Sequence, residues 1–127
     1  MKFYTTREEA KQLLAAGLWR DTADMYFEQL KPDEYNFIPC LGKGMGGDIP
    51  CWTVNALLNL LPSPINKIYV LTIVKYEDDE GLVYDIQYST DEGCGDIIFE
   101  TSNQSLFEAV YDAVVWWLKY QKEKQHL

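Results

Sequence analysis

The last third of the chain constrains the fold most, because it contains a helical segment that is apolar on two sides. The spacing predicts one long helix over about residues 106–122, with Ser105 and Glu108 at capping-box spacing. A helix at a protein surface normally keeps a broad polar face. Here only Glu108, Asp112 and Lys119 interrupt an apolar middle. We therefore expect this helix to be covered on two sides, by its own domain or by a second subunit.

A first, shorter helix is predicted near the beginning of the sequence. Either Thr5 with Glu8 or Thr6 with Glu9 has the spacing of a capping box at its start. Gly17 is placed to end it. This helix is expected to be short and amphipathic.

A second short helix is predicted over residues 54–60. Thr53 is suited to be its N-cap, and Pro62 stops it on the other side. Between the two helices, residues 25–30 and 35–38 are candidates for short strands.

A change to strand-like patterns follows. Residues 67–76 are β-branched and aromatic on both faces, which predicts a central strand, and residues 82–89 alternate as a half-buried strand does. Residues 77–81 are expected to form the hairpin loop, and a turn over 91–95 leads into a third strand over 96–101. The predicted fold is one α+β domain over residues 1–127. Its mainly antiparallel sheet of three to five strands packs against the C-terminal helix, with two shorter helices beside it.

The cysteines and the apolar segments indicate the cellular compartment of the protein. Three cysteines, Cys40, Cys51 and Cys94, are an odd number and lie far apart, which is typical of reduced thiols in a cytoplasm. The sequence begins with polar residues where a signal peptide would need an apolar run. No apolar stretch approaches the roughly 20 residues that cross a bilayer. We expect a cytoplasmic protein without a membrane partner.

The net charge of −9 is concentrated in one part of the chain. Residues 76–118 contain eleven acids and no Lys or Arg, whereas the remainder holds nine acids and eleven bases. This sign opposes direct binding to nucleic acid or to an acidic membrane. One hypothesis is an acidic decoy that imitates nucleic acid toward a DNA- or RNA-binding protein. The expected acidic surface contains Glu77, Asp78, Asp79, Glu80, Asp91 and Glu92.

Catalytic candidates are few. Cys51 stands just before a predicted helix start, where a thiol pKa can be lowered. A cysteine nucleophile commonly needs a histidine, and the one histidine, His126, is next to the last residue. The spacing of the cysteines fits no structural zinc motif. We predict no catalytic residues, no metal and no cofactor, with Cys51 as a buried packing residue.

A glycine-rich loop is the alternative candidate for a ligand site. Gly42, Gly44 and Gly47 match G-x-G-x-x-G, but in a dinucleotide site these glycines open directly into a helix. Five residues intervene here before the predicted helix cap. The loop is expected to be a connector. A small-ligand site or a hydrolase using this loop and Cys51 is kept as an alternative.

Three segments carry a resemblance to a known family. They are residues 17–26, the Ile-Pro-Cys-Trp run at 49–52, and residues 56–62, followed by the aromatic C-terminal helix. Together they resemble a family of small proteins without known activity from gut bacteria and their phages and mobile elements. The resemblance covers most of the chain in order, and the glycine-rich insertion at 42–47 departs from it. It implies a setting rich in small accessory and interaction proteins, and it implies no catalytic residues.

The aromatic C-terminal helix suggests a function in protein interaction. Trp116, Trp117 and Tyr120 are the residue types that mark interfaces when they are exposed. We expect a small acidic accessory protein without catalytic activity. Its expected partner is another protein, or a second copy of itself in a homodimer.

Overall fold

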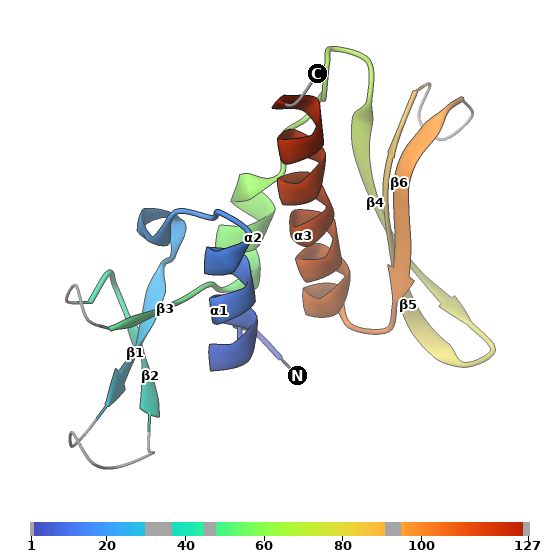
Figure 1. Cartoon of the computed structure of the whole chain (residues 1–127). Coiled ribbons are helices and arrows are strands. Elements are labelled where there is room, and N and C mark those ends of the chain that lie inside the picture. The colour runs from blue at the N-terminus through green and yellow to red at the C-terminus, as the bar shows by residue number, and fades with distance from the viewer. Residues whose placement is uncertain (1, 30–36, 45–47, 91–94, 126–127) are drawn as a thin grey trace.

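The computed structural model describes residues 2–29, 37–44, 48–90 and 95–125 and has an α+β fold. Two three-stranded antiparallel sheets stand on either side of a group of helices (Figure 1). The α+β class, the antiparallel pairing and the long C-terminal helix are as predicted. The strands are divided between two sheets and do not form one.

The two short helices begin at side-chain caps. Helix α1 (Arg7–Ala15) is capped by Thr6, whose hydroxyl accepts from the Glu9 N–H at 3.1 Å while the Glu9 carboxylate accepts from the Thr6 N–H at 2.9 Å. This confirms the second of the two predicted capping boxes. Gly17 follows the helix with φ +101°, a left-handed conformation that suits glycine. Helix α2 (Val54–Leu60) has the predicted bounds, and Thr53 caps it.

The first sheet has the order β2-β1-β3 and is built from β1 (Met25–Gln29), β2 (Phe37–Leu41) and β3 (Ile49–Cys51). A 3₁₀ turn, η1 (Arg20–Thr22), precedes it. Strand β3 was not predicted. Three residues with a proline in the middle give no alternating pattern, so this strand depends on its pairing with β1.

The second sheet is a meander of order β4-β5-β6, formed by β4 (Val70–Asp78), β5 (Gly81–Ser89) and β6 (Ile97–Asn103). The predicted meander is confirmed, but the prediction of a central strand over residues 67–76 is wrong. Strand β5 is central, and β4 is an edge strand. The β4–β5 connection is also shorter than predicted, because Asp78 already pairs with Gly81.

Helix α3 (Leu106–Gln125) runs between the two layers, with α2 on one side and strands β5 and β6 on the other (Figure 1). Its fully buried residues Ala109, Val110, Ala113 and Val114 join α1, α2 and β5 in the main core. The chain itself therefore covers both apolar sides of the helix. No helix in the described part of the chain is long and apolar enough to cross a bilayer.

Candidate functional site

The aromatic half of α3 packs onto the second sheet. The Trp116 ring stacks on Phe99 with centroids 4.8 Å apart and lies 5.4 Å from the ring of Tyr88. Tyr120 lies a further 5.0 Å from Trp116 on the same helix. Trp116, Trp117 and Tyr120 are all half-buried. Trp116 is therefore mainly a core contact between helix and sheet, and not a free interface residue.

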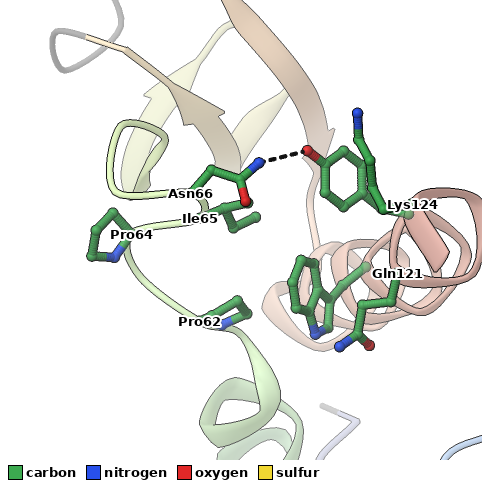
Figure 2. A pocket seen from close by; sticks show the side chains of 8 residues that line it. Pro62, Pro64, Ile65, Asn66, Gln121 and Lys124 are labelled. Atoms are coloured by element: carbon green, nitrogen blue, oxygen red, sulfur yellow. Dashed lines mark hydrogen bonds between the residues drawn. The ribbon is translucent and has the colours of Figure 1, made fainter. Parts of the chain in front are cut away.

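Trp117 and Tyr120 line a shallow hollow of about 280 Å³ beside the proline-rich segment after α2 (Figure 2). Asn66 points across it and donates to the Tyr120 hydroxyl at 3.2 Å. The Lys124 ammonium lies 5.4 Å from the Tyr120 ring centroid. A second hollow of about 300 Å³ also borders Trp117 and reaches Trp19. Among the described lining residues of the two hollows there is no carboxylate, histidine or cysteine, and the ionisable groups of the first are Tyr120 and Lys124.

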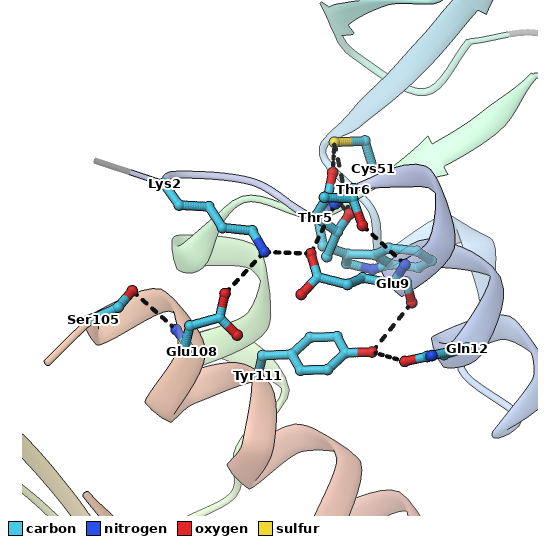
Figure 3. A network of polar contacts seen from close by, with 10 residues as sticks. Lys2, Thr5, Thr6, Glu9, Gln12, Cys51, Ser105, Glu108 and Tyr111 are labelled. Carbon is cyan, nitrogen blue, oxygen red and sulfur yellow. Dashed lines mark hydrogen bonds and ion pairs between the residues drawn. The ribbon is translucent and has the colours of Figure 1, made fainter. Parts of the chain in front are cut away.

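A polar network joins the N-terminal segment to α1 and α3 (Figure 3). The Lys2 ammonium lies 2.7 Å from the Glu9 carboxylate and 2.9 Å from the Glu108 carboxylate. Burial lowers the pKa of Lys2, but the hydrogen bonds and charges of the two carboxylates outweigh it, and the net pKa is raised. The Tyr111 hydroxyl donates to the Gln12 side-chain oxygen at 2.8 Å. The network links the N-terminal segment, α1 and α3, and Lys2 stays charged within it.

A third hollow, of about 590 Å³, lies beside this network. Most of its lining is apolar, and its two charged residues, Lys2 and Glu108, are paired with each other. Such a recess suits an apolar group and provides no unpaired acid or base among its described lining residues. The apolar lining residues are Phe3, Val54, Leu82, Tyr84, Leu106 and Phe107.

Cys51 lies at the end of β3 with none of its surface exposed. Its thiol donates to the Thr5 carbonyl oxygen at 3.5 Å and accepts from the Thr5 hydroxyl at 3.8 Å. Burial is the main cause that raises the pKa of Cys51 to about 11; the nearby Asp24 charge adds to it, and the Thr5 bonds oppose it. A nucleophile needs the reverse, an accessible thiolate. The geometry therefore fits the packing interpretation.

Cys51 should accordingly resist alkylation in the folded protein. We expect iodoacetamide at neutral pH to modify Cys40, which is half-buried on β2, while Cys51 stays unmodified until the chain is unfolded in urea. Peptide mass mapping of native and urea-treated samples measures both sites. Equal modification of the two cysteines in the native sample would contradict the buried environment of Cys51.

The glycine loop is held by its neighbours. Gly42 and Gly44 have φ values of +104° and +69°, and a Cβ on Gly44 would lie 2.7 Å from the Tyr26 ring. The left-handed backbone favours glycine at both positions, and close packing against Tyr26 also requires it at position 44. The Lys43 ammonium donates to the Ala23 carbonyl oxygen at 2.9 Å. Gly47 lies outside the described residues.

The acidic residues do not gather on one face. Glu77, Asp78, Asp79 and Glu80 are exposed around the β4–β5 turn, but Asp85 lies on the sheet face opposite α3. On the other side of the sheet, Glu108 binds Lys2, and Asp112 accepts from Thr101. A phosphate imitation needs the acids on one surface, so this arrangement does not favour the decoy hypothesis. Asp91 and Glu92 lie outside the described residues, and no group of metal-ligating side chains occurs among those described.

Strand β4 is a candidate binding site that the sequence did not predict. Its side chains alternate between the α3 side, where Ile73 is 41% exposed, and the opposite face, where Val74 and Tyr76 are 46% and 41% exposed. The Leu71 N–H donates to the Ser63 hydroxyl at 3.2 Å and thus points away from β5. Because backbone groups alternate along an antiparallel strand, the N–H groups of residues 73, 75 and 77 also point to the open edge.

The other three sheet edges carry features that oppose pairing. Strand β2 contains Pro39, β3 contains Pro50, and the β5–β6 ladder shifts register at Tyr88 and Ser89. Prolines, bulges and charges are the usual means of blunting an edge strand. Strand β4 has no proline, glycine or register shift, and Lys75 is its only basic residue. It is the best-formed pairing edge of the described structure.

Comparison of the chain with protein-family models, with curated proteins and with solved structures finds no match. The resemblance to small proteins of gut bacteria and their phages stays a prediction.

Proposed function

We propose that this chain is a small accessory domain without catalytic activity, which binds another polypeptide by pairing it with strand β4. The observation that supports this proposal is the open edge of β4. The strand is nine residues long, apolar for most of its length and exposed on both faces. A monomer gains nothing from such an edge and risks aggregation, whereas a binding domain uses it to add a strand.

The expected binding mode follows from the orientation of the strand. The N–H and C=O groups of residues 73, 75 and 77 offer main-chain hydrogen bonds to an extended segment. Val74 and Tyr76, on the face away from α3, add apolar and aromatic contacts beside those bonds. Affinity then comes from the backbone, and selectivity comes from the alternating side chains.

The proposed interaction surface is the edge of the second sheet and not α3, where the sequence suggested it. The α3 aromatics are largely satisfied within the chain, as the stacking of Trp116 on Phe99 illustrates. The non-enzymatic part of the proposal is supported by Cys51, the strongest nucleophile candidate, which is buried with a raised pKa. The expected cytoplasmic location is retained as part of the same proposal.

Photo-cross-linking in the native host tests this function. We expect a benzoylphenylalanine that replaces Tyr76 to cross-link a defined polypeptide. The same group in place of Trp19, which is 77% exposed and lies just before η1, far from β4 in the sequence, should not. Adding Ile73→Pro should lower the cross-link yield at least tenfold, because proline removes the edge N–H and leaves the β5 ladder intact.

Circular dichroism is the folding control for the Ile73→Pro variant, whose spectrum should match that of the parent. A cross-link from position 76 that is unaffected by the proline, or equal to that from position 19, would reject β4 as the binding strand.

A further inference from the structure

We infer that the polypeptide that pairs with β4 is a second copy of this chain, in an antiparallel arrangement about a two-fold axis beside Tyr76. This inference rests on the proposed function and specifies its partner. The result is a continuous six-stranded sheet, with the two β4 strands at its centre. Three observations lead to it: the part of the edge that is open, the charges on that part, and the position of the acidic turn.

Ser63 limits the length of edge that a partner strand can use. Its hydroxyl accepts the Leu71 N–H at 3.2 Å, so the first outward-pointing amide of β4 is already bonded within the chain. At the other end, the strand stops at Asp78, where the turn to β5 begins. The open edge therefore extends from Ile73 to Asp78.

A two-fold axis places one residue of this stretch opposite itself. With Val74 at the centre, pairing would require the Leu71 amide opposite Glu77, and Ser63 already occupies that amide. With Lys75 at the centre, two ammonium groups would face each other, which is destabilising. With Tyr76 at the centre, neither problem arises.

The register centred on Tyr76 is also complementary in charge. It sets Lys75 of each chain opposite Glu77 of the other copy, so the same ion pair forms twice. Both side chains are exposed and lie on the α3 side of the sheet, opposite Tyr84 and Leu82 of β5. Directly opposed unlike charges stabilise a strand pair, so Lys75 selects this register and opposes neighbouring ones. On the other face the two Tyr76 rings become neighbours.

The acidic turns do not meet in this arrangement. Antiparallel pairing places the two β4–β5 turns on opposite sides of the two-fold axis, so Asp79 and Glu80 of each chain lie beside the first half of β4 of the other copy and not beside its turn. The two chains still repel at long range, because each carries a net charge of −9. A single strand pair is also smaller than a standard protein interface. We therefore expect a weak dimer that tightens as salt screens the repulsion.

Charge-reversal variants test the register centred on Tyr76 directly. By sedimentation velocity at 0.15 M salt, the wild-type chain should dimerise with rising concentration. Lys75→Glu and Glu77→Lys should each weaken dimerisation at least tenfold, because each places like charges in opposition twice. A mixture of the two variants should dimerise again, since every opposed pair is then of unlike sign, and so should the double variant. Lys11→Glu and Glu8→Lys make the same changes of net charge on α1 and should alter dimerisation much less, because they act only through the long-range repulsion.

The outcomes separate this inference from the function on which it rests. A wild-type chain that stays monomeric up to millimolar concentration overturns self-pairing, and a cross-link from position 76 to a different polypeptide then supports the proposed function alone. A dimer that the mixture of variants fails to restore overturns the Tyr76 register. A dimer that survives Lys75→Pro, which removes an outward N–H used in this register, overturns pairing through β4 altogether.

Discussion

Replacing Trp52 by alanine is expected to lower the free energy of unfolding by about 4 kcal/mol, because it empties the largest fully buried site of the core. The Trp52 side chain is completely covered, and its indole N–H donates to the Thr22 hydroxyl at 2.9 Å. Alanine removes the apolar contacts and leaves that hydroxyl without its indole partner. Urea denaturation followed by far-ultraviolet circular dichroism measures the loss.

Trp19→Ala is the matched control, since the same side chain is removed from a position that is 77% exposed. Its expected effect is about 0.5 kcal/mol or less. Similar losses for the two variants would show that Trp52 does not pack as described.

Raising the pH from 9 to 11 is expected to remove about 2 kcal/mol of stability through Cys51 alone. The folded pKa of this thiol is about 11, against an ordinary value of 9.0, and burial is the main cause. Since the folded chain holds the proton more tightly, this stability is fully present below pH 9 and is lost as the pH rises through 11. Two pKa units correspond to about 2.7 kcal/mol.

The Cys51→Ala variant isolates this contribution. Unfolding free energies are measured for both proteins at a series of pH values between 7 and 11, and their difference is plotted. Alkaline titration of Tyr88, whose buried hydroxyl has a pKa raised to about 12, occurs in both proteins and cancels. The wild-type advantage should shrink steadily above pH 9. A difference that stays constant over the series would contradict the raised thiol pKa.

The helices could be predicted from the sequence because their ends are encoded locally. Thr53 and Pro62 delimit α2, and the Thr6–Glu9 pair starts α1, so neighbours within a few residues determine each boundary. The β4–β5–β6 meander was predictable for a similar reason, since short turns separate strands of clear pattern.

The position of β4 in its sheet could not be predicted. A strand that is apolar on both faces is expected at the centre of a sheet, and it is equally expected where a second chain covers it. The sequence contains the residues but not the neighbour that would bury Ile73 and Val74. Strand β3 was missed because three residues with Pro50 have no period, and only pairing with β1 defines it.

In the candidate site, too, some features could be predicted from the sequence and others could not. Trp116 and Trp117 have the composition of an interface, but the sequence does not say whether the chain itself covers them; Phe99 and Tyr88 do so for Trp116. Conversely, the interpretation of Cys51 as a packing residue needed only the lack of a nearby base in the sequence, and its complete burial agrees with it.

The open edge of β4 also separates the residues that we propose to recognise a partner from those that stabilise the fold. Val74, Lys75 and Tyr76 contribute little buried surface, whereas the core depends on α1, α2, α3 and the inner face of β5. Mutations along this strand can therefore accumulate with small folding cost. A lineage of such proteins can exchange one binding preference for another over evolutionary time while its scaffold stays the same.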